Sequence, residues 1–150
     1  MRQIARAIVI RGEQLLVMKR DKHGEKFFAL PGGDIESGET PEQATVRETL
    51  EETSIEVKVV REIYREEVEE FGETSYFICS YVSGEPKLDP NAIEVKLSAE
   101  GNVYQPMWLE IRALEDTVFL PRTIAHKLEQ DLELGFAKQV TVIKGQKENL

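Results

Sequence analysis

Residues 33–55 read GDIESGETPEQATVRETLEETSI, and the interpretation of the whole chain starts from this stretch. It predicts a glycine-containing loop followed by a helix that begins just after Thr40. Thr40 is a good N-cap, Pro41 suits the first helical position, and Gln43 completes a capping box. Residues 44–53 contain no glycine or proline, so the helix is expected to run to about Thr53.

Three glutamates of this helix share one face. Glu48, Glu51 and Glu52 stand at i, i+3 and i+4, where side chains are neighbours. Clustered carboxylates are natural ligands of hard cations, and an oxygen-only set favours Mg²⁺, with Mn²⁺ as an alternative, over zinc or copper. The competing interpretation is a solvated acidic face, because like charges at this spacing cost only about 0.2–0.5 kcal/mol in water. In a partly dry cleft each pair would repel by roughly 3 kcal/mol, and the cluster would then need a cation.

The whole stretch resembles the signature of the Nudix hydrolase superfamily. The positions that match it are Gly33, Glu39, Arg47, Glu48, Glu51, Glu52 and Ile55, with Pro31 and Gly32 just upstream. The resemblance implies a single Nudix domain over residues 1–150. Its fold class would be α+β (mixed α/β), an α/β/α sandwich with a mixed β-sheet between helices.

Two positions depart from the signature. Thr49 stands where an aliphatic residue is usual; we expect it to face the sheet and to hydrogen-bond one turn back, near Thr45. Ser54 stands where glycine is usual, and a left-handed conformation there would cost roughly 1 kcal/mol unless the helix ends another way. Neither change removes a metal ligand.

The resemblance implies roles for the residues around the acidic face. Glu48, Glu51 and Glu52 would hold one or more Mg²⁺ ions, with Glu52 the firmest ligand, and the carbonyl of Gly32 would join them. A box glutamate would act as the base: Glu48 is the first choice, and Glu39 is a weaker candidate for a base or a supporting residue.

Arg47 is expected to pair with a carboxylate of this box and to fix its rotamer, the alternative being an ordinary surface arginine. The family often adds a carboxylate from a later loop. Glu100 is our candidate for it and Glu94 the alternative, and a solvated loop acid is an equal explanation for either.

Substrate contacts are less clearly marked by the sequence. Arg20 ends the second strand, where the resemblance suggests a phosphate contact and plain solvent exposure is the alternative. Phe28 and Tyr76 are candidates for stacking on a base, although aromatic residues on strands more often belong to the core.

The implied activity is Mg²⁺-dependent cleavage of a phosphoanhydride bond in a nucleoside diphosphate linked to another group. The run from Gly38 to Ala44 resembles the branch that sanitises nucleoside triphosphates and favours that substrate. One alternative is a non-catalytic nucleotide-binding regulatory module, although such a module usually loses box glutamates. Another is an isomerase of isoprenoid diphosphates, which would need a suitably placed cysteine. Cys79 lies in the apolar run 76–82 and is expected to be a buried, inert thiol.

Composition limits the classes of partner. The 150 residues are 41% hydrophobic with a formal net charge of −9, which disfavours binding to nucleic acid or to anionic membranes. A small nucleotide or nucleoside diphosphate derivative remains the expected partner, provided that a metal and local Arg or Lys reverse the field at the site. One cysteine excludes an internal disulfide, and no signal or membrane segment is evident, so we expect a cytoplasmic protein. An edge-strand homodimer through residues 138–144 is an alternative to a monomer.

The remaining pattern predicts mainly antiparallel strands and a second helix. Expected strands cover residues 4–11 and 14–19 (a hairpin), 27–30, 55–66, 74–83 (central), 93–97 (short), 104–111 (with Pro106 at an edge or bulge) and 138–144. Loops are expected at residues 20–26 and through most of 84–102, a helical turn at 112–116, a helix at 121–134 and a frayed end at 145–150. His126 falls off the apolar stripe of this last helix and is expected to be solvated.

Overall fold

The computed structural model describes residues 1–145, which form three α-helices, a short 3-10 helix and eight strands. The helices are α1 (Pro41–Thr53), α2 (Ile93–Ala99), η1 (Ile111–Asp116, the 3-10 helix) and α3 (Arg122–Leu134). The strands are β1 (Arg2–Arg11), β2 (Gln14–Lys22), β3 (Glu25–Ala29), β4 (Gly32–Asp34), β5 (Glu56–Val68), β6 (Gly72–Ser83), β7 (Asn102–Glu110) and β8 (Thr141–Lys144). Residues 146–150, part of the expected frayed end, lie outside the described residues.

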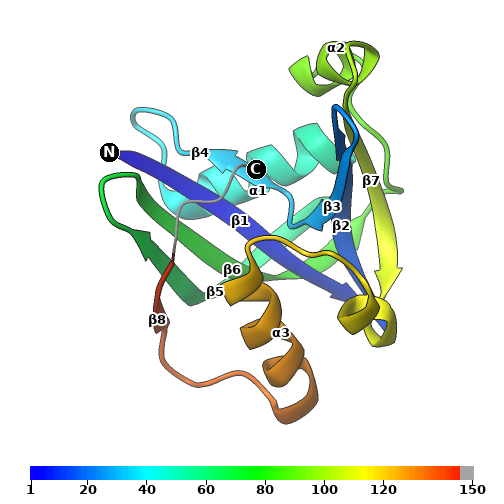
Figure 1. The fold of residues 1–150 in the computed structure, drawn as a ribbon. Coiled ribbons are helices and arrows are strands. Elements are labelled where there is room, and N and C mark those ends of the chain that lie inside the picture. Colours follow the sequence, from blue (N-terminus) through cyan, green and yellow to red (C-terminus); the bar gives the residue numbers. More distant parts are fainter. Residues whose placement is uncertain (146–150) are drawn as a thin grey trace.

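The strands make one mixed sheet that divides into two walls. Its order is β3-β2-β1-β6-β5-β8, with β4 paired to β1 and β7 paired to β2. The pairs between β1 and β2 are Ile10 with Leu15 and Arg11 with Gln14, at the hairpin end. Beyond that point β1 pairs with β4 and, in parallel, with β6, whereas β2 pairs with β3 and β7. The two walls therefore diverge from the hairpin towards the other end of the sheet (Figure 1).

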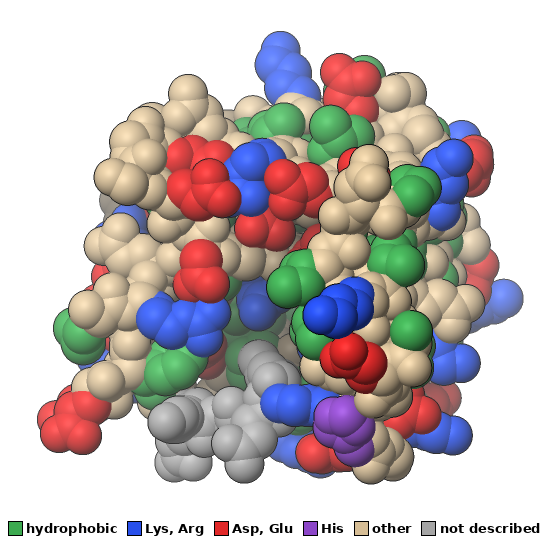
Figure 2. Space-filling model, turned by 90° about the horizontal axis from the view of Figure 1, so that it is seen from above, with side chains coloured by type: hydrophobic (Ala, Val, Ile, Leu, Met, Phe, Trp, Pro, Cys, Tyr) green, Lys and Arg blue, Asp and Glu red, His purple; other side chains and the backbone are tan. Residues whose placement is uncertain are grey.

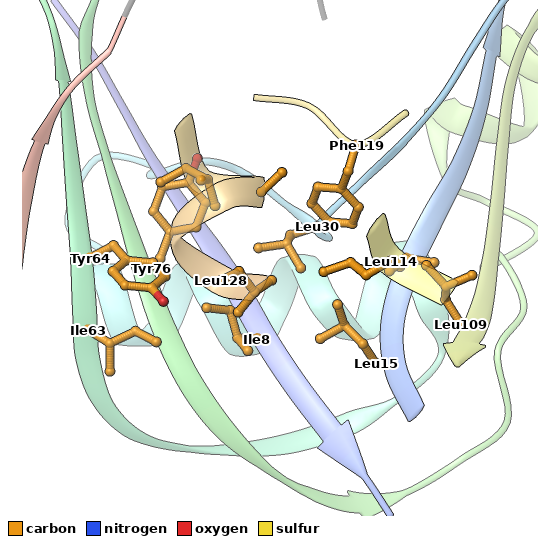
Figure 3. Packing of buried hydrophobic residues seen from close by; sticks show 13 residues of the cluster. Ile8, Leu15, Leu30, Ile63, Tyr64, Tyr76, Leu109, Leu114, Phe119 and Leu128 are labelled. Carbon is orange, nitrogen blue, oxygen red and sulfur yellow. The ribbon is translucent and has the colours of Figure 1, made fainter. Parts of the chain in front are cut away.

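Helices cover both faces of the β1 wall. Side chains alternate along a strand, so Ala5, Ala7 and Val9 pack in a buried cluster with Ala44 of α1. Ile8 faces the opposite way, into a second buried cluster. That cluster joins residues of both walls to α3 and η1 (Figure 3): Ile8, Leu15, Val17, Leu30, Ile63, Tyr64, Tyr76, Leu109, Leu114, Phe119, Ile124, Ala125 and Leu128. The expected α/β/α sandwich with a mixed sheet is confirmed.

The local predictions for α1 are confirmed in detail. The Oγ1 of Thr40 accepts the N–H of Gln43 at 3.1 Å, and the Oε1 of Gln43 accepts the N–H of Thr40 at 2.9 Å, which completes the capping box. Thr49 is fully buried, and its hydroxyl donates to the carbonyl of Thr45 at 2.6 Å. Ser54 takes the left-handed conformation, with φ 61° and ψ 16°.

Three segments differ from the expectation. Residues 33–34, in the expected glycine-containing loop, form the short strand β4 together with Gly32, and β4 pairs with β1. Residues 20–26 were expected to form a loop, but β2 runs to Lys22 and β3 begins at Glu25, because the pairing of β2 with β3 continues to the turn at residues 23–24. Residues 93–97 were expected to form a strand but lie in α2. Ile93 and Val95 produced the apolar alternation of a strand, yet both are exposed to solvent.

The other elements follow the predictions closely. The first hairpin, the central strand β6 and helix α3 are confirmed, and Pro106 pairs with Met18 on the outer strand β7. The last strand is shorter than expected, covering Thr141–Lys144 and running parallel to β5. His126 is exposed, as expected. Within residues 1–145, no helix has the length and apolar character needed to cross a membrane.

Candidate active site

Arg47 joins the loop before α1 to the acidic face of the helix. Its Nε and Nη2 donate to both carboxylate oxygens of Glu39, at 2.7 and 2.9 Å. Its Nη1 donates to Glu48 at 3.0 Å and to Glu51 at 3.4 Å, and its Nη2 also reaches the carbonyl of Asp34 at 3.1 Å. A planar guanidinium can make these contacts together because its donors form a fixed fork. The expected pairing of Arg47 with a box carboxylate is seen in this geometry.

Glu39 serves this arrangement as a partner of Arg47. The hydrogen bonds from Arg47, and then the one from the backbone N–H of Glu36, lower the pKa of Glu39 to about 2. The same contacts with Glu39 are the main cause that raises the pKa of Arg47. A carboxylate held ionised so firmly is a weak proton acceptor near neutral pH, so the geometry favours a supporting role for Glu39 over that of a base.

Glu48 lies against the glycine loop. A Cβ added to Gly33 would stand 2.7 Å from the carboxylate carbon and from Oε1 of Glu48, so only glycine leaves room for this side chain. Burial raises the pKa of Glu48, while the hydrogen bond from Arg47 acts in the opposite direction. A carboxylate whose pKa is raised holds a proton more readily than an ordinary glutamate.

Glu52 is the most enclosed of the three glutamates. Only 7% of its surface is exposed, and its Oε2 accepts the backbone N–H of Gly32 at 3.1 Å. Burial raises the pKa of Glu52 to about 8, although Arg6 and the Gly32 N–H both favour the charged form. A buried carboxylate that is costly to ionise is a group that a bound cation would stabilise.

The three carboxylates do not converge on one point in this arrangement. Within residues 1–145, no group of three or more His, Cys, Asp or Glu side chains is placed to hold a metal ion. Arg47 is hydrogen-bonded to Glu48 and Glu51, while the carboxylate of Glu52 is hydrogen-bonded to the backbone N–H of Gly32. The donor chemistry still fits a hard cation, because all three are carboxylates of one helix and the neighbouring Gly32 and Gly33 present bare backbone.

A cavity of about 410 Å³ opens between the two walls of the sheet, next to Glu52. Alternate residues of two strands line it: Arg2, Ile4 and Arg6 of β1, and Met18, Arg20 and Lys22 of β2. Figure 2 looks onto the open end and shows acidic and basic side chains gathered around a hollow. Two rows of cations thus face a buried carboxylate inside a chain whose net charge is −9.

Arg20 is fixed on the cavity wall by aromatic rings and by the backbone. Phe27 and Tyr104 are its neighbours in register on the adjacent strands, and its guanidinium carbon lies 5.3 and 3.6 Å from their ring centroids. Its Nε donates to the carbonyl of Val103 at 3.0 Å, and its Nη2 donates to Asn102. Burial lowers the pKa of Arg20. Such a held guanidinium, lining the cavity, suits a phosphate oxygen.

The structure distinguishes between the two later carboxylates. Glu94, in the first turn of α2, lines the cavity together with Glu52. Glu100 ends α2, is exposed, and is not among the residues that line the cavity. The geometry therefore favours Glu94, the alternative, over Glu100, which was our first candidate.

The substrate-stacking prediction for Phe28 is not supported by its position. Side chains alternate along β3, so Phe27 lines the cavity while Phe28 packs against the buried cluster that contains Leu114 and Phe119. Tyr76 does line the cavity, but it is almost completely buried.

Sequence reasoning missed Arg6 and Lys22, which line the cavity beside Arg20. The Nη1 of Arg6 donates to the carbonyl of Leu30 at 2.8 Å, which holds the side chain close to the glycine loop. The sequence did contain a pattern that predicts them. Arg2 and Arg6 stand an even number of positions apart on one strand, and so do Arg20 and Lys22 on the next. Basic residues with period two mark one face of a strand.

Comparison with known proteins shows the family of this chain. A family model described as the NUDIX domain matches residues 1–127. The NAD-capped RNA hydrolase NudC of Pectobacterium carotovorum is 30% identical over 128 residues, which cover 80% of this chain and 49% of that protein. A putative nudix hydrolase 1 of Caenorhabditis elegans is 33% identical over 118 residues, covering 75% of this chain and 30% of that protein. The chain thus spans half or less of the length of these two relatives.

A solved structure gives the same result for the fold. The crystal structure of a NUDIX hydrolase from Nitrosomonas europaea superposes with a TM-score of 0.73 at 18% identity, covering 97% of this chain and 79% of that one. Because the family model covers most of the chain and includes the glycine loop, Arg47 and the three glutamates, this protein belongs to the Nudix hydrolase family.

Proposed function

We propose that this protein hydrolyses a phosphoanhydride bond in a nucleoside diphosphate linked to another group, with Mg²⁺ as its ion and Mn²⁺ as an alternative. One observation carries the proposal. The buried carboxylate of Glu52 and the cations Arg6, Arg20 and Lys22 line a single cavity in a strongly acidic chain. A cavity of that kind attracts a polyphosphate, which the rest of the surface would repel.

Glu48, Glu51 and Glu52 of α1 would hold the divalent ion, with Glu94 completing the carboxylate set and the Gly32 carbonyl as a further ligand. When bound there, such an ion neutralises phosphate oxygens and makes water a better nucleophile. On the opposite wall Arg6, Arg20 and Lys22 would bind the remaining phosphate oxygens and hold the anhydride in place.

Hydrolysis then requires one proton acceptor. As water attacks phosphorus, a new P–O bond forms, the bridging P–O bond breaks, and the leaving phosphate takes the electron pair. Glu48 would accept the proton of the attacking water, since its pKa is raised by burial. Arg47 and Glu39 would keep Glu48 in position.

Nucleoside triphosphates are the first substrates to test, because the run from Gly38 to Ala44 resembles that branch of the family. A second candidate is a dinucleotide of the NAD type, since the Pectobacterium relative at 30% identity is named for NAD-capped RNA. The net charge of −9 favours the free dinucleotide over a capped RNA chain, whose phosphates would be repelled.

The test is a substrate panel scored for bond cleavage. The purified chain is incubated with ribo- and deoxynucleoside triphosphates, NAD and ADP-ribose, each with Mg²⁺, Mn²⁺ or EDTA, and the products are separated by anion-exchange chromatography. We expect pyrophosphate and a nucleoside monophosphate from the preferred triphosphate, and no product with EDTA. Tight nucleotide binding by calorimetry without cleavage of any substrate would instead identify a binding module.

A further inference from the structure

Ser54 occupies a backbone conformation that disfavours serine. It follows the last turn of α1 with φ 61°, and its N–H donates to the carbonyl of Leu50 at 2.9 Å. Residues with a Cβ are strained in this region, which is why glycine is the usual residue after a helix. Glycine is also the usual residue at this position of the Nudix signature. Unlike glycine, serine brings a hydroxyl to this position, and the contacts of that hydroxyl are what distinguish it.

The hydroxyl of Ser54 helps to bind a distant segment, residues 87–92, to the end of α1. It donates to the carbonyl of Lys87 at 2.6 Å. The N–H of Lys87 donates to the carbonyl of Thr53 at 2.9 Å, and the N–H of Asp89 donates to that of Glu51 at 3.2 Å. The last carbonyls of a helix lack partners within the helix. Here the N–H groups of residues 87 and 89 are the partners of two such carbonyls. The hydroxyl of Ser54 adds a hydrogen bond that is donated by the helix end and accepted by the segment.

Residues 87–92 are followed directly by the helical turn that carries Glu94. The carbonyl of Asp89 accepts the N–H of Ala92, and its carboxylate accepts the N–H of Asn91, both at 2.9 Å. Helix α2 begins at the next residue, Ile93, and Glu94 lines the cavity. Helix α2 contains no buried residue and contacts β7, and residues 87–92 are the connection that joins its first turn to the end of α1.

We infer that Ser54 is a positioning residue that sets the place of Glu94 through residues 87–92. The carbonyls that hold this segment belong to the turn of α1 that carries Glu51 and Glu52, so one helix end positions all three carboxylates. The inference rests on the proposed function, in which Glu94 completes the ion site. It explains why this chain has serine where the family signature has glycine.

The experiment is a double-mutant cycle in the full chain with Ser54→Gly, Glu94→Gln and their combination. Glycine removes the hydroxyl and accepts the left-handed backbone, so the single variant is expected to stay folded. Mn²⁺ affinity is measured without substrate, from the electron paramagnetic resonance signal of free Mn²⁺, and kcat and KM are measured with the preferred nucleotide. Ser83→Ala is the matched control, because its hydroxyl also makes one exposed hydrogen bond, but to Glu56 on the neighbouring strand β5 and not to residues 87–92.

We expect Ser54→Gly to weaken Mn²⁺ binding and to lower kcat by about 2- to 10-fold, the range for losing one hydrogen bond, with KM little changed. In the Glu94→Gln background the same change should have almost no further effect, because both substitutions act through one carboxylate. Hydrogen exchange of the amides in residues 87–95 should become faster in Ser54→Gly, while the interior of α1 stays protected. Ser83→Ala should match the wild type.

An equal loss in the wild-type and Glu94→Gln backgrounds would overturn the inference, as would a Ser54→Gly variant that binds Mn²⁺ like the wild type. If the wild type binds Mn²⁺ but cleaves nothing, the proposed function fails and the Mn²⁺ cycle alone decides the role of Ser54. If the wild type neither binds Mn²⁺ nor cleaves any nucleotide, both proposals fail.

Discussion

The backbone N–H of Gly32 donates a hydrogen bond to the carboxylate of Glu52, with 3.1 Å between the nitrogen and Oε2. The contact joins the first residue of β4 to the last turn of α1. It also leaves a nearly buried carboxylate beside the cavity, with its pKa raised to about 8 chiefly by burial. This arrangement is costly without a cation, and the first prediction follows from that cost.

Glu52→Gln should abolish metal-dependent turnover and yet stabilise the metal-free protein at alkaline pH. The pKa of Glu52 in the folded chain is about 8, above the ordinary 4.5, so the folded chain holds the proton more tightly. The resulting stability is complete below about pH 4.5 and is lost as the pH rises through 8, each pKa unit being worth about 1.4 kcal/mol. Glutamine stays neutral and can still accept the Gly32 hydrogen bond.

Thermal unfolding in EDTA from pH 4.5 to 9 checks this expectation. The variant should melt higher than the wild type at pH 9, and the difference should shrink towards pH 4.5. Mg²⁺ should raise the melting temperature of the wild type but not that of the variant. Turnover of the variant at the wild-type rate would contradict the role of Glu52.

Gly33→Ala should damage catalysis more than folding. The added methyl group would stand 2.7 Å from the carboxylate of Glu48 and displace it, so we expect kcat to fall by roughly 10-fold or more, as for a misplaced catalytic group. Gly38→Ala is the control, because its φ of +82° makes alanine strained while no atom lies within 4 Å of the new Cβ. It should lose about 1 kcal/mol of folding free energy and keep its kcat. Equal kcat values for the two variants would contradict this assignment.

Arg47→Lys should lower kcat by about 10- to 100-fold while the charge at the position is kept, the range typical of residues that orient a metal site. Lysine has a single ammonium and cannot bond Glu39 and Glu48 together in the fork geometry of arginine. Steady-state kinetics at saturating Mg²⁺ measures the change. Arg61→Lys offers a comparison, since the side chain of Arg61 donates to the backbone carbonyls of Lys138 and Ala137. A full-rate Arg47→Lys enzyme would show that the guanidinium has no positioning role.

Cys79 should be inert and dispensable for catalysis. It is buried, and burial raises the pKa of its thiol to about 12, so almost none of it is thiolate at neutral pH. We expect no reaction with iodoacetamide at pH 7.5 in the native protein, full reaction in urea, and unchanged kcat in Cys79→Ala. Rapid native labelling together with loss of activity would instead support thiol chemistry, as an isomerase would require.

The positions of most strands and of two helices along the chain could be predicted from local patterns, whereas strand order and register could not. The capping box, the glycine loop and the i, i+3, i+4 glutamates are short-range features, so α1 and its acidic face could be predicted before any contact was known. The prediction of a strand at residues 93–97 was wrong, and the reason is also local. Alternating apolar residues also occur on an exposed helix, and only the missing neighbour strand shows that Ile93 and Val95 do not belong to a sheet.

Short-range patterns along the chain were enough to predict the family signature, the helix that bears the glutamates and the pairing of Arg47. Contacts between distant segments were needed to see that Glu94, not Glu100, reaches the cavity, that Phe27 rather than Phe28 faces it, and that Arg6 lies close to Glu52. These relationships depend on how two walls of a sheet diverge and on which way each strand turns its side chains. The spacing of residues along the chain shows which side chains share one face of a strand. Which faces of different strands and helices pack together depends on the fold.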